Sequence, residues 1–164
     1  SRLNPLKRVD LLVRAMARTR SDVRCLIVGQ GGEQDRLQEL VRRHGLGDRV
    51  EFLGFVADAD LVGLYANALA LFYAPLDEDY GLVTVEAMKS AKPVITADDS
   101  GGVLEFVEQG VTGVIVDHED LDALAGEIDR LAGDRETVRR MGEQGRERVA
   151  GITWDATIDR LLEV

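Results

Sequence analysis

The sequence is short of cysteine, of positive charge and of long apolar runs, and each shortage excludes a class of protein. Its 164 residues include one cysteine, Cys25, so no disulfide can form within the chain. The apolar runs are far shorter than the roughly 20 residues that a membrane-spanning helix needs. The net charge is −10, and so acidic a chain lacks the basic face that broad binding to nucleic acid or to a membrane surface requires.

What is present is the composition of a globular domain. Hydrophobic residues make up 45% of the chain and charged residues 30%, which provides enough apolar material for a packed core. The length fits one domain, and no internal repeat or low-complexity tract divides it. We therefore predict a single domain over residues 1–164. Because the chain opens with Ser1 and not with methionine, we expect it to be cut from a longer protein.

Short apolar segments recur along the chain and are rich in β-branched and aromatic residues. Most of them do not alternate between apolar and polar positions, which is typical of strands buried on both faces. Such strands are predicted over residues 23–29, 50–56, 68–74, 93–97 and 113–117.

Between these segments the apolar residues follow the spacing of amphipathic helices. Helices are predicted over 8–18, through Leu37–Val41 before Gly45, from a cap at Asp58 through Tyr65, around Val85 and Met88, from Asp120 to Gly133, over 135–149, and over 153–163 with Trp154 near its start. Alternating strands and helices imply parallel βαβ units, so the predicted fold class is α/β, a doubly wound parallel sheet with C-terminal helices. A further strand is expected ahead of the 8–18 helix, where only residues 1–3 precede the loop.

Ligands of such sheets bind beside the carboxyl ends of the strands, where loops lead into helices. The first of these loops carries Arg2, Lys7 and Arg8 around an Asn4-Pro5 turn. A guanidinium and an ammonium group together suit a diphosphate. Solvated charge near a chain end is the ordinary alternative, and for this loop taken alone that alternative is favoured.

The segment EDYGLVTVEAM places two carboxylates, Glu78 and Glu86, on either side of a predicted helix start. The free N–H groups of Gly81, Leu82 and Val83 and the positive end of the helix dipole favour a phosphate there. Glu86, about one turn into the helix, suits a ribose diol, and Glu78 suits a sugar hydroxyl. Either glutamate alone is typical of surface charge, but combined with the basic loop the pair predicts one ligand site.

The remaining motifs give weaker evidence for a ligand site. The stretch GQGGE fails as a dinucleotide fingerprint because Gln34 stands where a third glycine belongs. DSGG, residues 99–102, is typical of a sharp turn, and a structural use is at least as well supported as ligand contact. The Asp-x-Asp triplets lack a supporting histidine, since His44 is expected at a helix end and His118 in an acidic turn. We therefore expect no metal site.

Several stretches together resemble the C-terminal, nucleotide-sugar donor-binding domain of the group 1 glycosyltransferases, which are retaining enzymes of the two-domain GT-B fold. The resemblance covers essentially the whole chain, in order, and the paired-glutamate segment is its most specific part. It is carried by SRLNPLKRVDLLVRAM, LIVGQGG, VEFLGFV, EDYGLVTVEAMKSAKPVITADDSGG and EQGVTGVIV. It implies a Rossmann-like donor domain here and an N-terminal acceptor domain that is absent from this chain.

The resemblance also implies a role for each candidate residue. Arg2 and Lys7 match the basic pair that binds the donor diphosphate, and Glu78 matches the glutamate that contacts the donor sugar. These three are the expected catalytic residues. The expected substrate-binding set comprises the same three, with Phe55 and Val56 at the base, Gly81, Leu82 and Val83 at the phosphate, and Glu86 at the ribose. The EDYG sequence differs from the pair that many members have before the glycine, which leaves the sugar open.

The implied activity is transfer of a hexosyl group from a GDP-, UDP- or ADP-sugar to a glycan or glycolipid, with mannosyl transfer and polysaccharide synthesis as family-level options. No cofactor or metal is expected, and nucleic acid is not an expected partner. Because the acceptor domain would act in cis from the missing half, the isolated domain should bind donor weakly and transfer little or no sugar. The expected location is cytoplasmic, with the full-length enzyme an option at the inner membrane surface.

Two alternatives remain open from the sequence. One is a non-catalytic nucleotide-binding or regulatory module, which the absence of an acceptor domain would suit. The other, a nicotinamide-dependent oxidoreductase, rests on the fold pattern alone and is weakened by Gln34.

Overall fold

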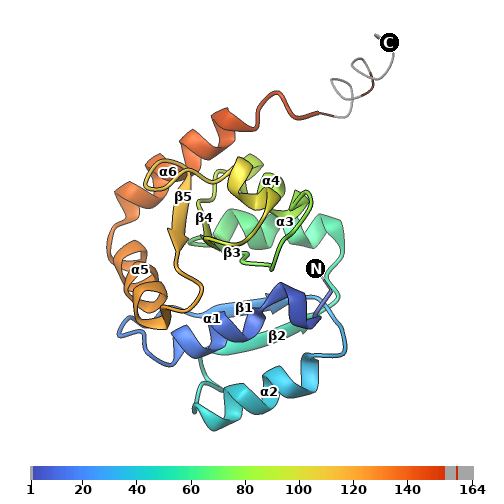
Figure 1. The fold of residues 1–164 in the computed structure, drawn as a ribbon, viewed down its shortest axis with the longest axis vertical. Helices are drawn as coiled ribbons and strands as arrows, with labels where there is room; N and C mark the ends of the chain where they lie inside the picture. The colour runs from blue at the N-terminus through green and yellow to red at the C-terminus, as the bar shows by residue number, and fades with distance from the viewer. Residues whose placement is uncertain (1, 154–157, 159–164) are drawn as a thin grey trace.

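The computed structural model describes residues 2–153 and residue 158 (Figure 1). Strands and helices alternate as the sequence predicts, and the last two described helices follow each other without a strand. The helix predicted over 153–163, with Trp154, falls almost wholly outside the described residues. The helices are α1 (Val9–Met16), α2 (Gln34–Arg43), α3 (Asp58–Asn67), α4 (Leu82–Lys89), α5 (Leu121–Gly133) and α6 (Arg135–Arg148), with 3-10 turns η1 (Pro5–Lys7) and η2 (Gly102–Glu105). The strands are β1 (Cys25–Val28), β2 (Val50–Gly54), β3 (Leu71–Phe72), β4 (Val94–Ala97) and β5 (Gly113–Val116).

The described strands all pair in parallel, but they form two sheets. β1 pairs with β2, and the second sheet has the order β3, β4, β5. Residues 2–8 contact the carboxyl ends of both sheets. The Leu3 N–H donates to the Gln30 carbonyl beyond β1 at 2.9 Å, and the Leu76 N–H beyond β3 donates to the Leu6 carbonyl at 2.8 Å. The predicted α/β fold with parallel pairing is confirmed, and the expected sheet is interrupted between β1 and β3.

The strand predicted over 68–74 is reduced to Leu71–Phe72, the two residues that pair with β4. By contrast, β4 lies between two neighbours and is buried along its whole length. The lone cysteine is buried in β1, and burial raises the pKa of the Cys25 thiol to about 12. At neutral pH it is therefore a small apolar core side chain and not a reactive thiolate.

Helix ends agree in part with the sequence. The Asp120 carboxylate accepts hydrogen bonds from the Asp122 and Ala123 N–H groups and begins α5 as predicted. The cap predicted at Asp58 is wrong, because Asp58 is already the first residue of α3 and Ala57 holds the cap position. Across the part of the chain that the structure describes, each helix is too short or too polar to cross a membrane.

Candidate functional site

Arg8 joins three loops at the carboxyl edge of the sheets. Its guanidinium donates to the Ala74 carbonyl at 2.8 Å and to the Pro75 carbonyl at 3.0 Å. The same group forms a two-pronged ion pair with Asp99, with N–O distances of 2.7 and 2.5 Å. Asp99 lies in the loop after β4, and Arg8 holds the pKa of its carboxyl below the ordinary value. One side chain thus ties the first loop to the loops after β3 and β4.

This anchoring places Lys7 against Glu78, two residues that the sequence assigned to one site. The Lys7 ammonium is hydrogen-bonded and ion-paired to the Glu78 carboxylate. Tyr73, at the end of β3, completes a triangle, because its hydroxyl lies 2.9 Å from Lys7 Nζ and 2.9 Å from Glu78 Oε2. The ammonium also lies 5.3 Å from the centre of the Tyr73 ring, within cation–π range.

The triangle changes the titration of all three groups. The hydrogen bond from Lys7 is the main cause that lowers the pKa of Glu78. Burial opposes the charge on Lys7, but the bonds to Glu78 and Tyr73 outweigh it and raise the pKa of Lys7. Burial raises the pKa of Tyr73, so its hydroxyl stays protonated. At neutral pH the site therefore holds one fixed ammonium, one fixed carboxylate and a neutral phenol between them.

The glycines of the DSGG turn have a structural use at this site. The Gly102 N–H donates to the Glu78 carbonyl at 2.6 Å. A Cβ on Gly102 would lie 2.2 Å from the Asp79 carbonyl oxygen, and one on Gly101 would lie 2.6 Å from the Glu78 carbonyl oxygen. Only glycine permits this approach, so the turn after β4 fixes the backbone that carries Glu78.

The helix start that the sequence predicts as a phosphate cradle is the start of α4. Gly81 has φ 58° in the left-handed region and occupies the cap position, and Leu82 is the first helical residue. Leu82 is exposed and Val83 is half-buried. Because a first helical turn leaves its N–H groups without helical partners, this end is suited to an anion. Glu86 lies exposed on the same helix, where the Tyr65 hydroxyl donates to its carboxylate at 3.2 Å.

Three predicted site residues are not drawn into this contact network. Arg2 is exposed, and among the described residues its side chain makes no ion pair. Phe55 is 78% exposed and follows β2, and Val56 beside it is half-buried. Phe55 is nevertheless a large apolar side chain open to solvent at the same edge, as a base-stacking position would be.

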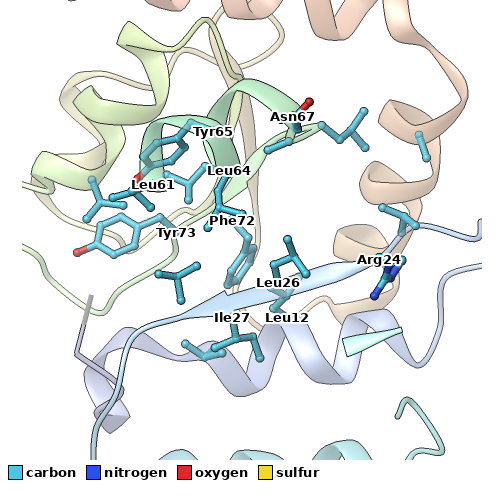
Figure 2. Close-up of a pocket in the computed structure, with 18 of the residues that line it drawn as sticks. Leu12, Arg24, Leu26, Ile27, Leu61, Leu64, Tyr65, Asn67, Phe72 and Tyr73 are labelled. Carbon is cyan, nitrogen blue, oxygen red and sulfur yellow. The ribbon is translucent and has the colours of Figure 1, made fainter. Parts of the chain in front are cut away.

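A cavity of about 1040 Å³ opens beside the triangle (Figure 2). Lys7, Tyr73, Val83 and Glu86 line one end of it, so residues from the first loop, β3 and α4 share one space. Between β1 and β3 its walls are largely apolar. Of the predicted donor residues, Lys7, Val83 and Glu86 line this cavity.

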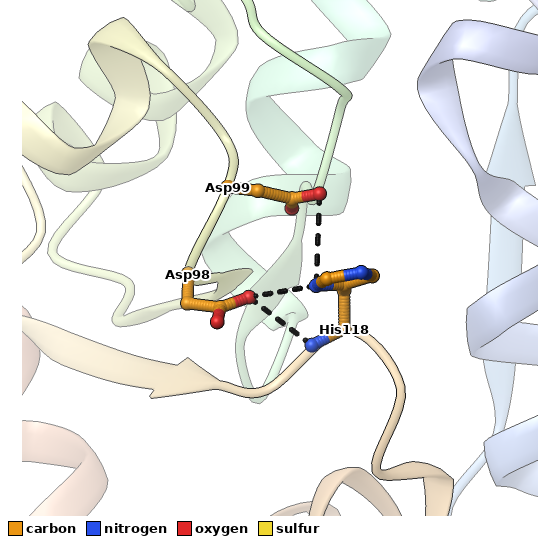
Figure 3. Close-up of side chains that lie close together, drawn as sticks. All are labelled: Asp98, Asp99 and His118. Atoms are coloured by element: carbon orange, nitrogen blue, oxygen red, sulfur yellow. Dashed lines mark hydrogen bonds and ion pairs between the residues drawn. The ribbon is translucent and has the colours of Figure 1, made fainter.

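A histidine and two aspartates gather beyond Arg8 (Figure 3). His118 Nδ1 lies 3.0 Å from Asp98 Oδ1 and 3.6 Å from Asp99 Oδ2, and the bond to Asp98 is the main cause that raises the pKa of His118. These are metal-ligating types, but Asp99 is already engaged on both oxygens by Arg8. The arrangement suits a protonated histidine with acidic partners.

The sequence missed the residues that hold the site in place. Arg8 was noted only as one of three basic residues, and Tyr73, Tyr65 and Asp99 received no role. The positions of Tyr73 just after β3 and of Asp99 in the loop after β4 were the available signal, whereas Tyr65 lies within α3. The GQGG turn is also structural, because a Cβ on Gly31 would lie 2.1 Å from the Leu3 carbonyl oxygen. That glycine allows the second loop to pack against the first.

Comparison with known proteins gives one consistent result. Residues 1–148 match the family model described as glycosyl transferases group 1. D-inositol 3-phosphate glycosyltransferase of Nocardia farcinica is 38% identical over 99% of this chain and 38% of its own length. A GDP-mannose-dependent alpha-(1-6)-phosphatidylinositol monomannoside mannosyltransferase of Mycobacterium tuberculosis is 36% identical over 99% of this chain and 45% of its own.

A solved structure agrees with the sequence relatives. HepE of Anabaena in complex with UDP-glucose superposes with a TM-score of 0.86 at 31% identity, over 100% of this chain and 47% of that one. In each of these three comparisons the chain spans less than half the length of the protein it matches.

Proposed function

The chain belongs to the glycosyl transferases group 1 family, and from this premise we propose that it is the part of a retaining hexosyltransferase that binds the nucleotide-sugar donor. The observation that carries the proposal is the meeting of Lys7 with Glu78 beside the start of α4. The structure of HepE with UDP-glucose supports a donor of this chemical class. The predicted Rossmann-like, GT-B-type fold is the confirmed part of the assignment.

In donor binding, the Lys7 ammonium and the Glu78 carboxylate would contact different parts of the donor. The diphosphate takes the Lys7 ammonium, with Arg2 and the amides of Gly81, Leu82 and Val83 around it. Hydroxyls of the sugar donate to the Glu78 carboxylate. The Lys7–Glu78 pair must therefore open as the donor binds, and each charge then acquires a partner from the donor.

The nucleoside part of the donor would lie toward the remaining residues. Glu86 accepts from the two ribose hydroxyls, which replace the Tyr65 hydroxyl as its donors. Phe55 and Val56 border the base. In this arrangement the donor crosses from the loop after β2 to the loop after β3.

The charges suit the chemistry of glycosyl transfer. When the bond from the anomeric carbon to phosphate breaks, negative charge develops on the nucleoside diphosphate and positive charge on the sugar ring. Lys7, Arg2 and the α4 amides stabilise the first, as fixed electrostatics in the transition state. Glu78 orients the sugar. No metal or cofactor is needed for these roles.

In this proposal the acceptor binds to a different domain of the protein. An N-terminal domain of the same polypeptide would hold a glycan or glycolipid acceptor, and this domain alone would be inactive in transfer. Mannosyl transfer is the preferred option for the sugar, supported by the printed activity of the M. tuberculosis relative. That relative's lipid acceptor would also suit a cytoplasmic enzyme at the inner membrane surface.

Calorimetry with GDP, UDP and ADP, each with and without an attached sugar, tests the proposal. At least one nucleotide should bind with a dissociation constant at or below the millimolar range. Absence of binding by every nucleotide at millimolar concentration, with the circular dichroism of the fold intact, would refute it. Tight binding of NADH in a fluorescence titration would favour the oxidoreductase alternative. The glycine turn gives that alternative no support, because Gly31 serves packing against Leu3.

A further inference from the structure

A second cavity, of about 340 Å³, lies at the opposite edge of the sheet from the proposed donor residues. Its lining includes Ala68, which precedes β3, and Lys92, which precedes β4. Both residues stand ahead of parallel strands, at the amino edge of the second sheet. Residues of α6 supply most of the remaining lining. The cavity is therefore separate from the donor site, whose residues lie beyond the carboxyl ends of the strands.

The close packing of α6 against the turn before β4 shapes this cavity. A Cβ on Gly142 would lie 2.0 Å from the Ala91 carbonyl oxygen, so only glycine permits this approach of the helix to the turn. Residues three or four apart are neighbours on a helix surface. Arg139 and Arg146 therefore flank Gly142, and the contact with the turn brings both of them near Lys92, which follows Ala91.

Three arginines line the cavity from one face of α6. Arg135, Arg139 and Arg146 are separated by four and seven residues, which is the spacing of a single helix face. Like charges four residues apart, as at Arg135 and Arg139, destabilise a helix. Arg135 and Arg146 form no ion pair among the residues that the structure describes, although the chain has more acidic than basic residues. The arginine face therefore carries a cost for the fold that an anionic ligand would remove.

Lys92 adds a fourth positive charge from the turn. Its ammonium donates to the Ala66 carbonyl at 2.8 Å, near the end of α3, and two of its three N–H donors are left for a ligand. Among the described lining residues Glu143 is the one acid, and it forms an exposed ion pair with Arg139. Such exposed pairs are weak, so an anion can compete for the guanidinium. The cavity thus gathers four positive charges and one negative charge in a chain whose net charge is −10.

We propose that this cavity binds a phosphate monoester, carried either by a free small molecule or by a phospholipid headgroup. Guanidinium groups offer paired donors that match the oxygens of a phosphate, and the lysine adds a point charge. A volume of about 340 Å³ suits a small group and not an extended polymer. The acidic chain does not prevent binding, because charges more than about 8 Å away are largely screened at physiological salt.

A phosphate held here would leave the donor site open. It would lie at the amino edge of the sheet, whereas Lys7 and Glu78 lie at the carboxyl edge. The cavity would therefore attach the domain to a phosphorylated molecule or surface while the nucleotide-sugar donor enters from the other edge. The two sites share no residue, so failure of either proposal leaves the other standing.

Two binding experiments distinguish the sources of the phosphate. Amide chemical shifts of the ¹⁵N-labelled chain, recorded with glycerol 3-phosphate at constant ionic strength, test a free ligand. Saturable shifts should appear at Lys92, Arg135, Arg139 and Arg146, and shifts at residues 81–83 would report the donor site instead. Flotation with phosphatidylcholine vesicles that contain phosphatidic acid tests the headgroup, with pure phosphatidylcholine as the control. Absence of both signals, or equal shifts when sodium chloride replaces the phosphate, would overturn the proposal.

A double variant separates this cavity from the general charge of the chain. Arg135→Gln with Arg146→Gln should weaken the observed binding by about tenfold, because it removes charged hydrogen-bond donors. Arg42→Gln with Arg43→Gln is the matched control, since it removes the same charge from α2, where both arginines pair with Glu39. The control should change the affinity by less than about twofold. Equal weakening by the two double variants would overturn the assignment of the binding to this cavity.

The stability of the ligand-free chain gives a second readout. Because Arg135 and Arg139 repel each other on α6, Arg135→Gln should leave the urea midpoint unchanged or raise it. An arginine that served the fold alone would lower the midpoint when replaced. A lowered midpoint would therefore contradict the proposal that Arg135 is held in place for a ligand.

Discussion

The carboxyl edge of the sheets and the cavity between β1 and β3 differ in how their side chains are paired. At the edge, Arg8 and Asp99 pair with each other and Lys7 is held by Glu78 and Tyr73. The cavity between β1 and β3, by contrast, is lined largely by apolar side chains. The edge is therefore held by specific side-chain pairs, whereas the cavity wall is more openly packed. Substitutions should accordingly cost much at the edge and little at the cavity wall.

The largest effect is expected at the turn that supports Glu78. Gly102→Ala would place a Cβ 2.2 Å from the Asp79 carbonyl oxygen, and overpacking of this kind against backbone should cost about 3 kcal/mol. Urea unfolding measures the change. Gly126→Ala in α5 is the control, because apart from the neighbouring backbone of its own helix no atom lies within 4 Å of its Cβ, and it should stabilise by about 0.5–1 kcal/mol. Equal effects of the two changes would contradict the close approach.

The next largest effect is expected for Arg8, whose side chain joins three loops. Arg8→Met should lower the free energy of unfolding by about 2 kcal/mol, since it removes hydrogen bonds to a carboxylate and two carbonyls. It should also weaken nucleotide binding, because Lys7 loses its anchored neighbour. Arg24→Met is the control: the exposed pair of Arg24 with Glu51 should be worth less than about 1 kcal/mol. An Arg8 variant as stable as the Arg24 variant would contradict the claim that Arg8 stabilises the fold by joining three loops.

A smaller effect on nucleotide binding is expected when Glu78 is changed, and its sign should differ between the nucleotide and the attached sugar. Glu78→Gln removes the carboxylate that competes for Lys7, so a nucleoside diphosphate without sugar should bind about threefold more tightly, a gain of about 0.7 kcal/mol. The extra affinity contributed by an attached sugar should fall at the same time. Calorimetry with UDP and UDP-glucose separates the two. Parallel losses for both ligands would show that Glu78 does not divide its role between Lys7 and the sugar.

The same pair should produce a modest dependence of stability on pH. The pKa of Glu78 is lower in the folded chain than its ordinary value of 4.5, with Lys7 as the main cause. The pairing therefore contributes fully above 4.5 and is lost as the pH falls through the lower folded pKa. The stability difference between the parent and Lys7→Met should therefore shrink as the pH falls below 4.5. A difference that stays constant in urea unfolding across this range would argue against the pair.

Among the side-chain truncations, the smallest effect on the free energy of unfolding should come from the wall of the cavity between β1 and β3. Leu26→Ala, at a residue that is 45% exposed, should cost about 1 kcal/mol, whereas Leu37→Ala in the filled core should cost about 3 kcal/mol. Urea unfolding of the two variants measures this. An equal cost at the two positions would contradict the open packing around Leu26.

The sequence predicted the order of strands and helices well, because apolar runs and helical spacing report burial directly. It predicted a strand ahead of α1 but did not place a break in the sheet between β1 and β3, since pairing across the sheet depends on segments distant in sequence. The reduced strand at Leu71–Phe72 has the same cause. Its apolar residues were recognised, but only the part that meets β4 is paired.

For the site, the sequence predicted Lys7, Glu78, Gly81 and Glu86. The structure pairs Lys7 with Glu78, places Gly81 at the cap of α4, and places Lys7 and Glu86 on the lining of one cavity. The sequence did not predict that Lys7 and Glu78 would bond to each other, because both had been assigned to a ligand. It could not identify Asp99 as the partner of Arg8. These two residues are 91 positions apart, and no local pattern marks such an ion pair.

The central claim is that the carboxyl edge around Lys7 and the start of α4 holds a nucleotide-sugar diphosphate. Amide chemical shifts of the ¹⁵N-labelled chain, recorded as UDP-glucose is added, test it most directly. The account predicts the largest shifts at Lys7, Gly81, Leu82 and Val83, with smaller ones at Glu86. Shifts confined to other residues, or none at saturating ligand, would contradict it.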